Sequence, residues 1–321
     1  MTHSSVARSQ STSPSKPIRV AIVGDVHGQW DDRDESALIS LGVDLALFVG
    51  DFGNEAVELV EQVAEMSIPI AVALGNHDAW YSATIWGRQK CPYDRRYEDR
   101  VQQQLEALGA AHIGYSQRDF PQMQFGIVGG RPFSWGGPDW KHADFYADRF
   151  DVHSMQDSCD RIVQAAQQSR CETLVFVSHN GPTGLGDRPE DPCGRDWIPV
   201  GGDYGDPDLH AAIAATKASG KRVALVTFGH MHHALRHTRQ KLRKRVHVGD
   251  DGTVYLNAAC VPRVLEQGGT SYRNFSLASL AAGQVVRIQS VWASSEGAIA
   301  AQELLYAQPP CSSYALPAAS G

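Results

Sequence analysis

The chain has 321 residues, which fits one large α/β domain or two small ones, and its hydrophobic fraction of 42% and charged fraction of 20% are ordinary for a soluble globular protein. The formal net charge of -7 argues against a general nucleic-acid-binding surface. No apolar run approaches the ~20 residues needed to span a bilayer, so no membrane association is expected.

The N-terminal residues 1–17 are rich in Ser and Thr and lack the apolar core of a secretory signal, which predicts a disordered leader on a cytoplasmic protein. An organellar transit peptide is the alternative. Six cysteines without a CxxC pair are typical of reduced thiols. At the other end, the Ala/Pro/Ser-rich residues 296–321 predict a weakly ordered tail with room for one short helix.

Strand-like and helix-like segments alternate along the rest of the chain. Aliphatic, β-branched runs that end at Gly predict buried strands, and apolar residues at helical spacing predict helices. Asn54 is a plausible cap for the second helix. This alternation favours an α/β fold with helices on the sheet faces. In chain order, the expected elements are a strand at 20–23, a helix at 35–41, a strand at 45–49, a helix at 54–66, a strand in the run 70–75, a helix at 97–108, a strand at 125–130, a helix at 157–169, a strand at 174–177, a helix at 208–219, a strand in the run 222–229, and closing strands at 253–259 and 284–292.

Five hydrophobic runs end at side chains that bind metals. IRVAIVG is followed by Asp25 and His27, DLALFVG by Asp51, IAVALG by Asn76, His77 and Asp78, TLVFVS by His179, and RVALVTFG by His230 and His232. In open α/β sheets, sites form outside the carboxyl ends of strands, which is where these groups lie.

The donor types in these clusters indicate a particular chemistry. Mixed oxygen and imidazole donors favour Mn, Fe or Zn over Ca. Seven candidate ligands are too many for one tetrahedral zinc and suit two adjacent metals that share a carboxylate. Two metals about 3.5–4 Å apart clamp a phosphate and generate a hydroxide at neutral pH, so the pattern predicts phosphoester hydrolysis.

The ordered motifs GDVHG, GDFGN, GNHD, SHN and GHMHH resemble those of the calcineurin-like metallophosphoesterase superfamily. The resemblance runs from residue 18 to residue 233 and, through the closing strands, to about residue 292. It implies a single α/β domain over residues 18–295, a sandwich of mixed central sheets flanked by helices.

The resemblance also implies the role of each cluster. Asp25, His27 and His232 would hold the first metal, Asn76, His179 and His230 the second, and Asp51 would bridge them. His77 would lie beside the substrate phosphate, where it stabilises the transferring phosphoryl group or protonates the leaving oxygen. The nucleophile would be the water or hydroxide that bridges the two metals.

One position departs from the best-known relatives. Many of them, including the Ser/Thr protein phosphatases, carry Asp where this chain has Asn54, and that Asp orients the catalytic His. A carboxamide stabilises an imidazolium less than a carboxylate does, so His77 is predicted to be a weaker proton donor unless Glu55 or Asp78 substitutes. Asn54 and Asp78 are therefore expected to contact the site residues without binding metal themselves. The Asp-Arg-Gly signature of the protein phosphatases is also missing.

Three features around the predicted site allow two interpretations each. Arg131 and Arg195 are candidate contacts for the substrate phosphate or ordinary surface residues. Trp135, Trp140, Phe145 and Tyr146 line a substrate cleft or, as we favour, form a hydrophobic cluster under a long loop. The basic run 236–248 is a nucleic-acid patch or, as we favour, an exposed charged hairpin.

The sequence therefore predicts a metal-dependent hydrolase of a small phosphomonoester or phosphodiester, with two ions of Mn, Fe or Zn as cofactors. A Ser/Thr protein phosphatase is the first alternative. A non-catalytic scaffold that binds partners through the same fold is the second. Nucleic acid is the less favoured substrate.

Overall fold

The computed structural model describes residues 16–238 and 240–309. Residues 1–15 of the predicted leader and 310–321 of the predicted tail lie outside this range, so the structure does not test those parts of the two predictions. The cysteines within the described ranges are unpaired. None of the described helices has the length and apolar character that crossing a membrane requires.

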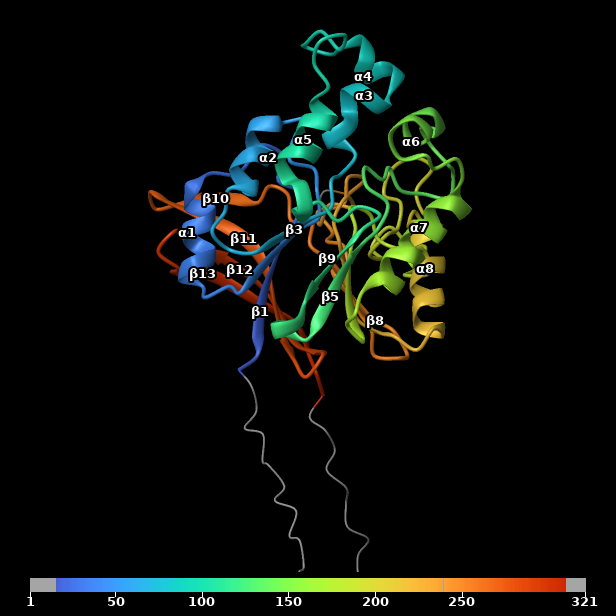
Figure 1. Ribbon diagram of the computed structural model, residues 1–321. Helices are drawn as coiled ribbons and strands as arrows, with labels where there is room; N and C mark the ends of the chain where they lie inside the picture. The colour runs from blue at the N-terminus through green and yellow to red at the C-terminus, as the bar shows by residue number, and fades with distance from the viewer. Residues whose placement is uncertain (1–15, 239, 310–321) are drawn as a thin grey trace, which may run out of the picture.

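The described strands form two mixed sheets that pack face to face (Figure 1). In the first sheet the three strands at one edge run parallel and the remaining neighbours pair antiparallel. In the second sheet the four central strands run parallel and the strand at each edge pairs antiparallel. The first sheet has the order β13 (Ile299–Ala307), β12 (Gln284–Ala293), β11 (Thr270–Ala281), β1 (Ile18–Val23), β2 (Leu45–Phe48) and β3 (Ile70–Val72), with β10 (Val264–Gln267) paired to β11. The second has the order β4 (Gln117–Phe120), β5 (Phe125–Gly129), β6 (Thr173–Val177), β7 (Arg222–Phe228), β9 (Val254–Asn257) and β8 (Val246–Val248).

Helices cover the outer faces of both sheets, so the molecule has four layers (Figure 1). The alternation of side chains along β1 shows how the layers are built: Val20 and Ile22 pack between the sheets, and Ala21 and Val23 pack under the helices. This confirms the predicted α/β sandwich. The first sheet is covered by α1 (Asp32–Ser40), α2 (Val57–Ala64) and α5 (Arg100–Leu108), and the second by α7 (Met155–Gln168) and α8 (Pro207–Ala218). The shorter α3 (Trp80–Ala83), α4 (Ile85–Gln89) and α6 (Ala143–Phe150) lie at the end where β1 finishes.

The structure corrects three expectations about these elements. Residues 299–307 form the edge strand β13, so the first sheet extends past the boundary predicted at residue 295. The segment is rich in helix formers, but pairing with β12 overrides that local preference. The Ser-rich strand β11 was not predicted, although it pairs with both β1 and β12. Finally, Asn54 does not cap α2, which begins at Val57 with Ala56 as its cap.

Candidate metal centre

All seven predicted metal ligands come from loops that follow strands, and the structure brings them together. Asp25 and His27 follow β1, Asp51 follows β2, and Asn76 follows β3. His179 follows β6, whereas His230 and His232 follow β7. The carboxyl ends of parallel strands from both sheets therefore deliver the whole set to one end of the sandwich.

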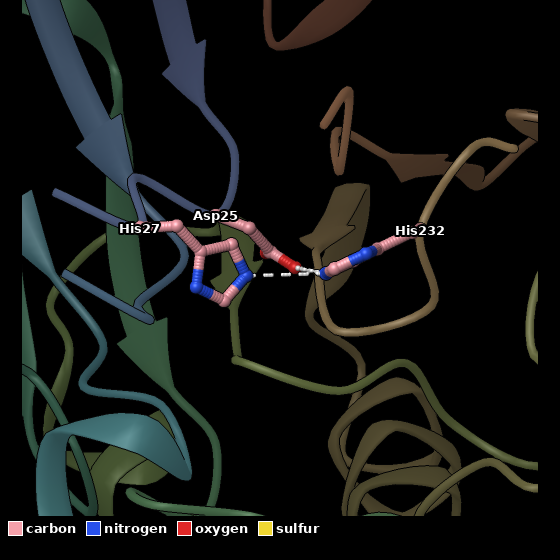
Figure 2. Close-up of side chains that lie close together, drawn as sticks. All are labelled: Asp25, His27 and His232. Carbon is pink, nitrogen blue, oxygen red and sulfur yellow. Dashed lines mark hydrogen bonds and ion pairs between the residues drawn. The ribbon is translucent and has the colours of Figure 1, made fainter. Parts of the chain in front are cut away.

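The first group consists of Asp25, His27 and His232, whose side chains point toward one another (Figure 2). The Nε2 atom of His232 lies 3.2 Å from Oδ2 of Asp25 and 3.2 Å from Nε2 of His27. Two imidazole nitrogens and one carboxylate oxygen thus surround one point. This set of donors suits a transition metal such as Mn, Fe or Zn.

The second group is built around His179. Its Nε2 atom lies 3.0 Å from Oδ1 of Asn76 and 3.2 Å from Nδ1 of His230. The other ring nitrogen, Nδ1, donates to the backbone carbonyl of Val49 at 2.7 Å. This hydrogen bond fixes the tautomer and leaves the Nε2 lone pair free for a cation.

Asp51 lies between the two groups and presents one oxygen to each. Its Oδ2 is 3.8 Å from Nε2 of His27, and its Oδ1 is 3.3 Å from Nε2 of His179. This is the position that a bridging carboxylate requires.

The charges at the centre require a cationic partner. Asp25, Asp51 and Asp78 are 0%, 2% and 0% exposed, and within the described residues none of them has an ion pair with Lys or Arg. Burial and the charge of Asp25 raise the pKa of Asp51 well above its usual range. Burial would also raise the pKa of Asp25, but the hydrogen bond and charge of His232 bring it below its usual range. Buried carboxylates of this kind are stable when they coordinate metal, so the residues fit two metal ions.

The backbone is strained at the predicted ligands. His27, Asp51 and His230 have φ angles of 45°, 56° and 64°, a region that costs non-glycine residues about 1–3 kcal/mol each. Close packing adds a second constraint, because a Cβ atom at Gly75 would lie 2.4 Å from Oδ1 of Asp51 and 2.7 Å from Cε1 of His179. The fold therefore tolerates local strain to aim these side chains inward.

Asp78, predicted to support the site, joins two of the ligand loops. Its carboxylate accepts hydrogen bonds from the backbone amides of Asp51, Phe52 and Gly75 at 2.9, 2.8 and 2.7 Å. Burial and the charge of Asp51 raise the pKa of Asp78 to about 8. The side chain holds the loops after β2 and β3 in register and does not reach the ring of His77.

His77 lies beside the two groups and is held on two sides. Its Nδ1 donates to Oδ1 of Asn54 at 2.6 Å, and its ring stacks on Trp80 with centroids 4.9 Å apart. Glu55, the other possible substitute for the missing Asp, instead accepts hydrogen bonds from the amide of Ser82 and the hydroxyl of Tyr93. Burial and the charges of nearby histidines lower the pKa of His77 to about 4.

Comparison with known families decides what this arrangement is. The model of the calcineurin-like phosphoesterase family matches residues 18–234. The chain belongs to this family. It is a metal-dependent phosphoester hydrolase, and the family depends on a dinuclear metal centre, which the two groups around Asp51 fit.

The solved structures that are similar to this chain share little of its sequence. A search of curated proteins found no match. A dimetal phosphatase from Danio rerio has 12% identity and a TM-score of 0.46, with 92% of this chain and 100% of that chain covered. A purple acid phosphatase from yellow lupin (Lupinus luteus) seeds has 14% identity and a TM-score of 0.39, with 90% and 53% covered. A 5'-nucleotidase precursor from Thermus thermophilus has 12% identity and a TM-score of 0.41, with 90% and 54% covered.

A cavity of about 280 Å³ opens beside the metal centre of this phosphoesterase. Its floor includes Asp51, Asn76, His77, His230 and His232. Its walls are formed by residues that the sequence analysis did not assign to the site or assigned differently: Trp80, Trp135, Lys141, Asp196, Trp197, Tyr204, Met231 and Arg236.

The two arginines that were candidate phosphate contacts do not line this cavity. Arg131 is only 2% exposed, and its guanidinium makes ion pairs of 3.0 Å with Asp206 and 3.2 Å with Asp208. The Arg195 Nε atom donates to the backbone carbonyl of Gly201 at 3.0 Å. Both side chains therefore hold loops in place. Arg131 is needed there because its positive charge compensates two buried carboxylates near the start of α8.

The four aromatic residues after Arg131 do not share one role: some form a hydrophobic cluster and one lines the cavity. Phe145 and Tyr146 are buried in the core under the helices, and Trp140 packs against that core. Trp135 instead lines the cavity. The preference for a hydrophobic cluster thus holds for three of the four residues.

The basic run 236–248 is in part the exposed charged hairpin that we favoured, because Ala234 and Leu242 pair antiparallel and Arg236, Lys241 and Lys244 are exposed. Two of its arginines depart from that prediction. Arg243 is buried, and its guanidinium donates to the backbone carbonyls of Pro189, Asp191 and Gly194. Arg245 is also buried. Unlike them, Arg236 is exposed and faces the cavity. The run therefore anchors the long loop after β6 and contributes one cation to the site.

Two of the cavity residues that the sequence analysis missed could have been found from their spacing to predicted site residues. Trp80 follows His77 by three residues, which places both on one face of a helical turn. Arg236 follows the predicted ligand His232 by only four residues, which places it close to the metal centre. By contrast, Trp197 and Tyr204 come from the long loop, where no local pattern indicates which side chains face inward.

Proposed function

We propose that the protein hydrolyses a small phosphomonoester or phosphodiester at a dinuclear centre whose two ligand groups share Asp51. The observation that carries this proposal is the position of Asp51, with one oxygen facing His27 and the other facing His179. The donors on both sides are imidazoles with a carboxylate or carboxamide, so we assign Mn, Fe or Zn as the metals.

The bound metal pair would supply positive charge for the phosphoryl oxygens and lower the pKa of water to near neutrality. Asp25, His27 and His232 would hold one ion, and Asn76, His179 and His230 the other. The donors come from the ends of five strands, which hold them close together, so little rearrangement is needed when metal binds.

His77 is assigned to the reacting phosphate. Its Nδ1 proton is committed to Asn54, which directs Nε2 away from that hydrogen bond. From there the ring stabilises the phosphoryl group or transfers a proton to the leaving oxygen. Burial and the neighbouring histidines lower the pKa of His77 to about 4 in the metal-free site, so the ring is neutral there.

Arg236 is assigned to the substrate in place of Arg131 and Arg195. It lines the cavity and is exposed. Among the described residues, no carboxylate lies within 4.0 Å of its guanidinium. A planar guanidinium in this position suits a phosphoryl oxygen.

The test uses purified protein loaded with Mn and offered p-nitrophenyl phosphate and bis-p-nitrophenyl phosphate. We expect turnover of at least one substrate and a loss of about 10²- to 10⁴-fold in kcat for His77→Ala, with both metals retained. His153→Ala is the matched control, because the side chain of this exposed histidine pairs with Asp151 and, among the described residues, with no other group. No turnover with two metals bound would overturn the proposal. An unchanged kcat in His77→Ala would remove His77 from the mechanism.

A further inference from the structure

The cavity beside the metal centre has aromatic walls that the hydrolytic reaction itself does not need. On one wall Trp135 stacks on Trp80, with centroids 5.1 Å apart and planes inclined by 30°. On the other, the ring of Trp197 meets Tyr204 edge to face at 4.7 Å. Trp80 already stacks on His77, so the aromatic surface begins at the predicted catalytic residue and extends away from the metals.

The two walls are tied together. The ammonium of Lys141 donates to the carbonyl of Gly136 at 2.8 Å and to the hydroxyl of Tyr204, and it lies 4.5 Å from the centroid of the Tyr204 ring. The amide of Gly137 donates to the carbonyl of Tyr204 at 2.8 Å. A Cβ atom at Gly137 would lie only 2.9 Å from the Tyr204 ring, so the ring lies directly on this glycine. The walls are thus a rigid part of the fold.

Core packing does not account for the tryptophans. Trp135 and Trp197 are half-buried and belong to none of the hydrophobic cores of the described residues, whereas nearby Phe145 and Tyr146 are buried in one. The indole N–H of Trp135 is buried and has no acceptor within the described residues. No hydrogen bond of the indole therefore explains why the ring is held at this place.

The two ends of the cavity differ in charge. The guanidinium of Arg236 lies over Trp197, 5.8 Å from its centroid, beside the metal ligands. The acid in the wall, Asp196, is neutralised, because it pairs with Arg243 at 3.4 Å and accepts from the amide of Arg236. An anion is therefore favoured at the metal end and a flat apolar group beyond it.

We propose that this phosphoesterase selects substrates whose organic group carries a planar aromatic ring, which stacks on Trp135 and Trp197 while the phosphate faces Arg236 and the metal centre. The proposal rests on the proposed function. A volume of about 280 Å³ lies at the lower end of the range for ligand pockets and admits one ring with its phosphate. The ring is either a nucleobase or a phenyl group, because both present the same flat π-face.

The test compares matched substrates with the Mn-loaded protein. The first pair is benzyl phosphate and cyclohexylmethyl phosphate, which differ in having a flat or a puckered ring. The second pair is a nucleoside 5'-monophosphate and ribose 5-phosphate, in both of which the phosphate is attached to the primary oxygen of a ribose. Each is offered as the monoester and as its methyl diester. We expect kcat/KM to be about tenfold higher or more for the aromatic member of at least one pair, and the pair with the larger ratio identifies the ring.

Substitutions of the two tryptophans test whether they cause the preference for aromatic substrates. Trp135→Leu and Trp197→Leu should each lower kcat/KM for the aromatic member about 5- to 20-fold and change the aliphatic member less than twofold. Trp292→Leu on β12 is the matched control, because that half-buried tryptophan does not line the cavity. Equal kcat/KM within both pairs would overturn the proposal. Variants that lower kcat/KM equally for both members of a pair would also overturn it, because the tryptophans would then only hold the loops in place.

A separate measurement distinguishes failure of the ring site from failure of the proposed function. Benzylphosphonate and cyclohexylmethylphosphonate are not hydrolysed, so their affinities are measured by calorimetry on the metal-loaded protein. Tighter binding of the benzyl compound that is lost in Trp197→Leu supports the aromatic site even if no ester is turned over. Equal binding of the two, together with equal rates on the nucleotide pair, counts against it.

Discussion

Arg131→Met should destabilise the protein by about 3–5 kcal/mol without altering how it recognises phosphate. The guanidinium lies 3.0 Å from Oδ1 of Asp206 and 3.2 Å from Oδ2 of Asp208, and both aspartates are buried at 0% and 1% exposure. Methionine retains much of the volume but leaves two carboxylates in the interior without a cation. The magnitude follows from that uncompensated charge, because each aspartate keeps only neutral hydrogen-bond donors, such as Ser134 and Ser158.

Urea denaturation of the metal-free protein, followed by tryptophan fluorescence, measures the change in the free energy of unfolding. Arg195→Met is the control, and it should cost about 1 kcal/mol, because its half-buried side chain donates one hydrogen bond to Gly201. Adding Asp206→Asn and Asp208→Asn to Arg131→Met should recover part of the loss, since the buried groups are then neutral. Wild-type stability combined with a raised KM in Arg131→Met would refute the reasoning and return Arg131 to the substrate.

Three further changes test other parts of the structure. Asn54→Asp should raise the pKa of His77 by roughly one unit or more, because a carboxylate stabilises the imidazolium, and should move to higher pH the limb of the pH–rate profile at which activity falls as the ring loses its proton, whereas an unmoved limb rules out this coupling. Gly75→Ala places a Cβ atom 2.4 Å from Oδ1 of Asp51, so metal analysis after dialysis should find fewer than two ions per folded chain. Burial lowers the pKa of His112 to about 4, so the folded state disfavours the protonated ring and loses stability as the pH falls from 6.5 towards 4. His112→Asn should therefore lose about 2–3 kcal/mol less than the wild type between pH 7 and pH 4.5, and parallel urea midpoints for the two proteins would contradict this.

The predicted ligands were readable from the sequence because each depends on a short-range feature. Parallel strands of one sheet end at the same edge, so Asp25 after β1 lies near Asp51 after β2, and His179 after β6 lies near His230 after β7. The packing of the two sheets then brings the two pairs together. Hydrophobic periodicity similarly gave the central strands and most of the helices. These parts of the fold follow from local chemistry and the rules of α/β packing.

The walls of the cavity depend on contacts that no local pattern specifies. Arg131 follows a buried strand just as the ligands do, yet Asp206, 75 residues further along the chain, removes it from the site. Arg236 and Arg243 lie in the same basic run, but one faces the cavity and the other is buried among the carbonyls of the loop after β6. Likewise, β13 has a helix-forming composition and becomes a strand only because β12 offers an edge.

The central claim is that two metals share Asp51, and a metal titration of Asp51→Asn beside His27→Asn tests it most directly. Wild-type protein should bind two Mn ions per chain. His27→Asn removes a ligand of the first group alone, so it should weaken one ion much more than the other. Asp51→Asn should weaken both ions together and abolish phosphoester hydrolysis, because both groups lose the oxygen that faces them. If Asp51→Asn instead weakens one ion and leaves the affinity of the other unchanged, Asp51 does not bridge the two groups and the account is wrong.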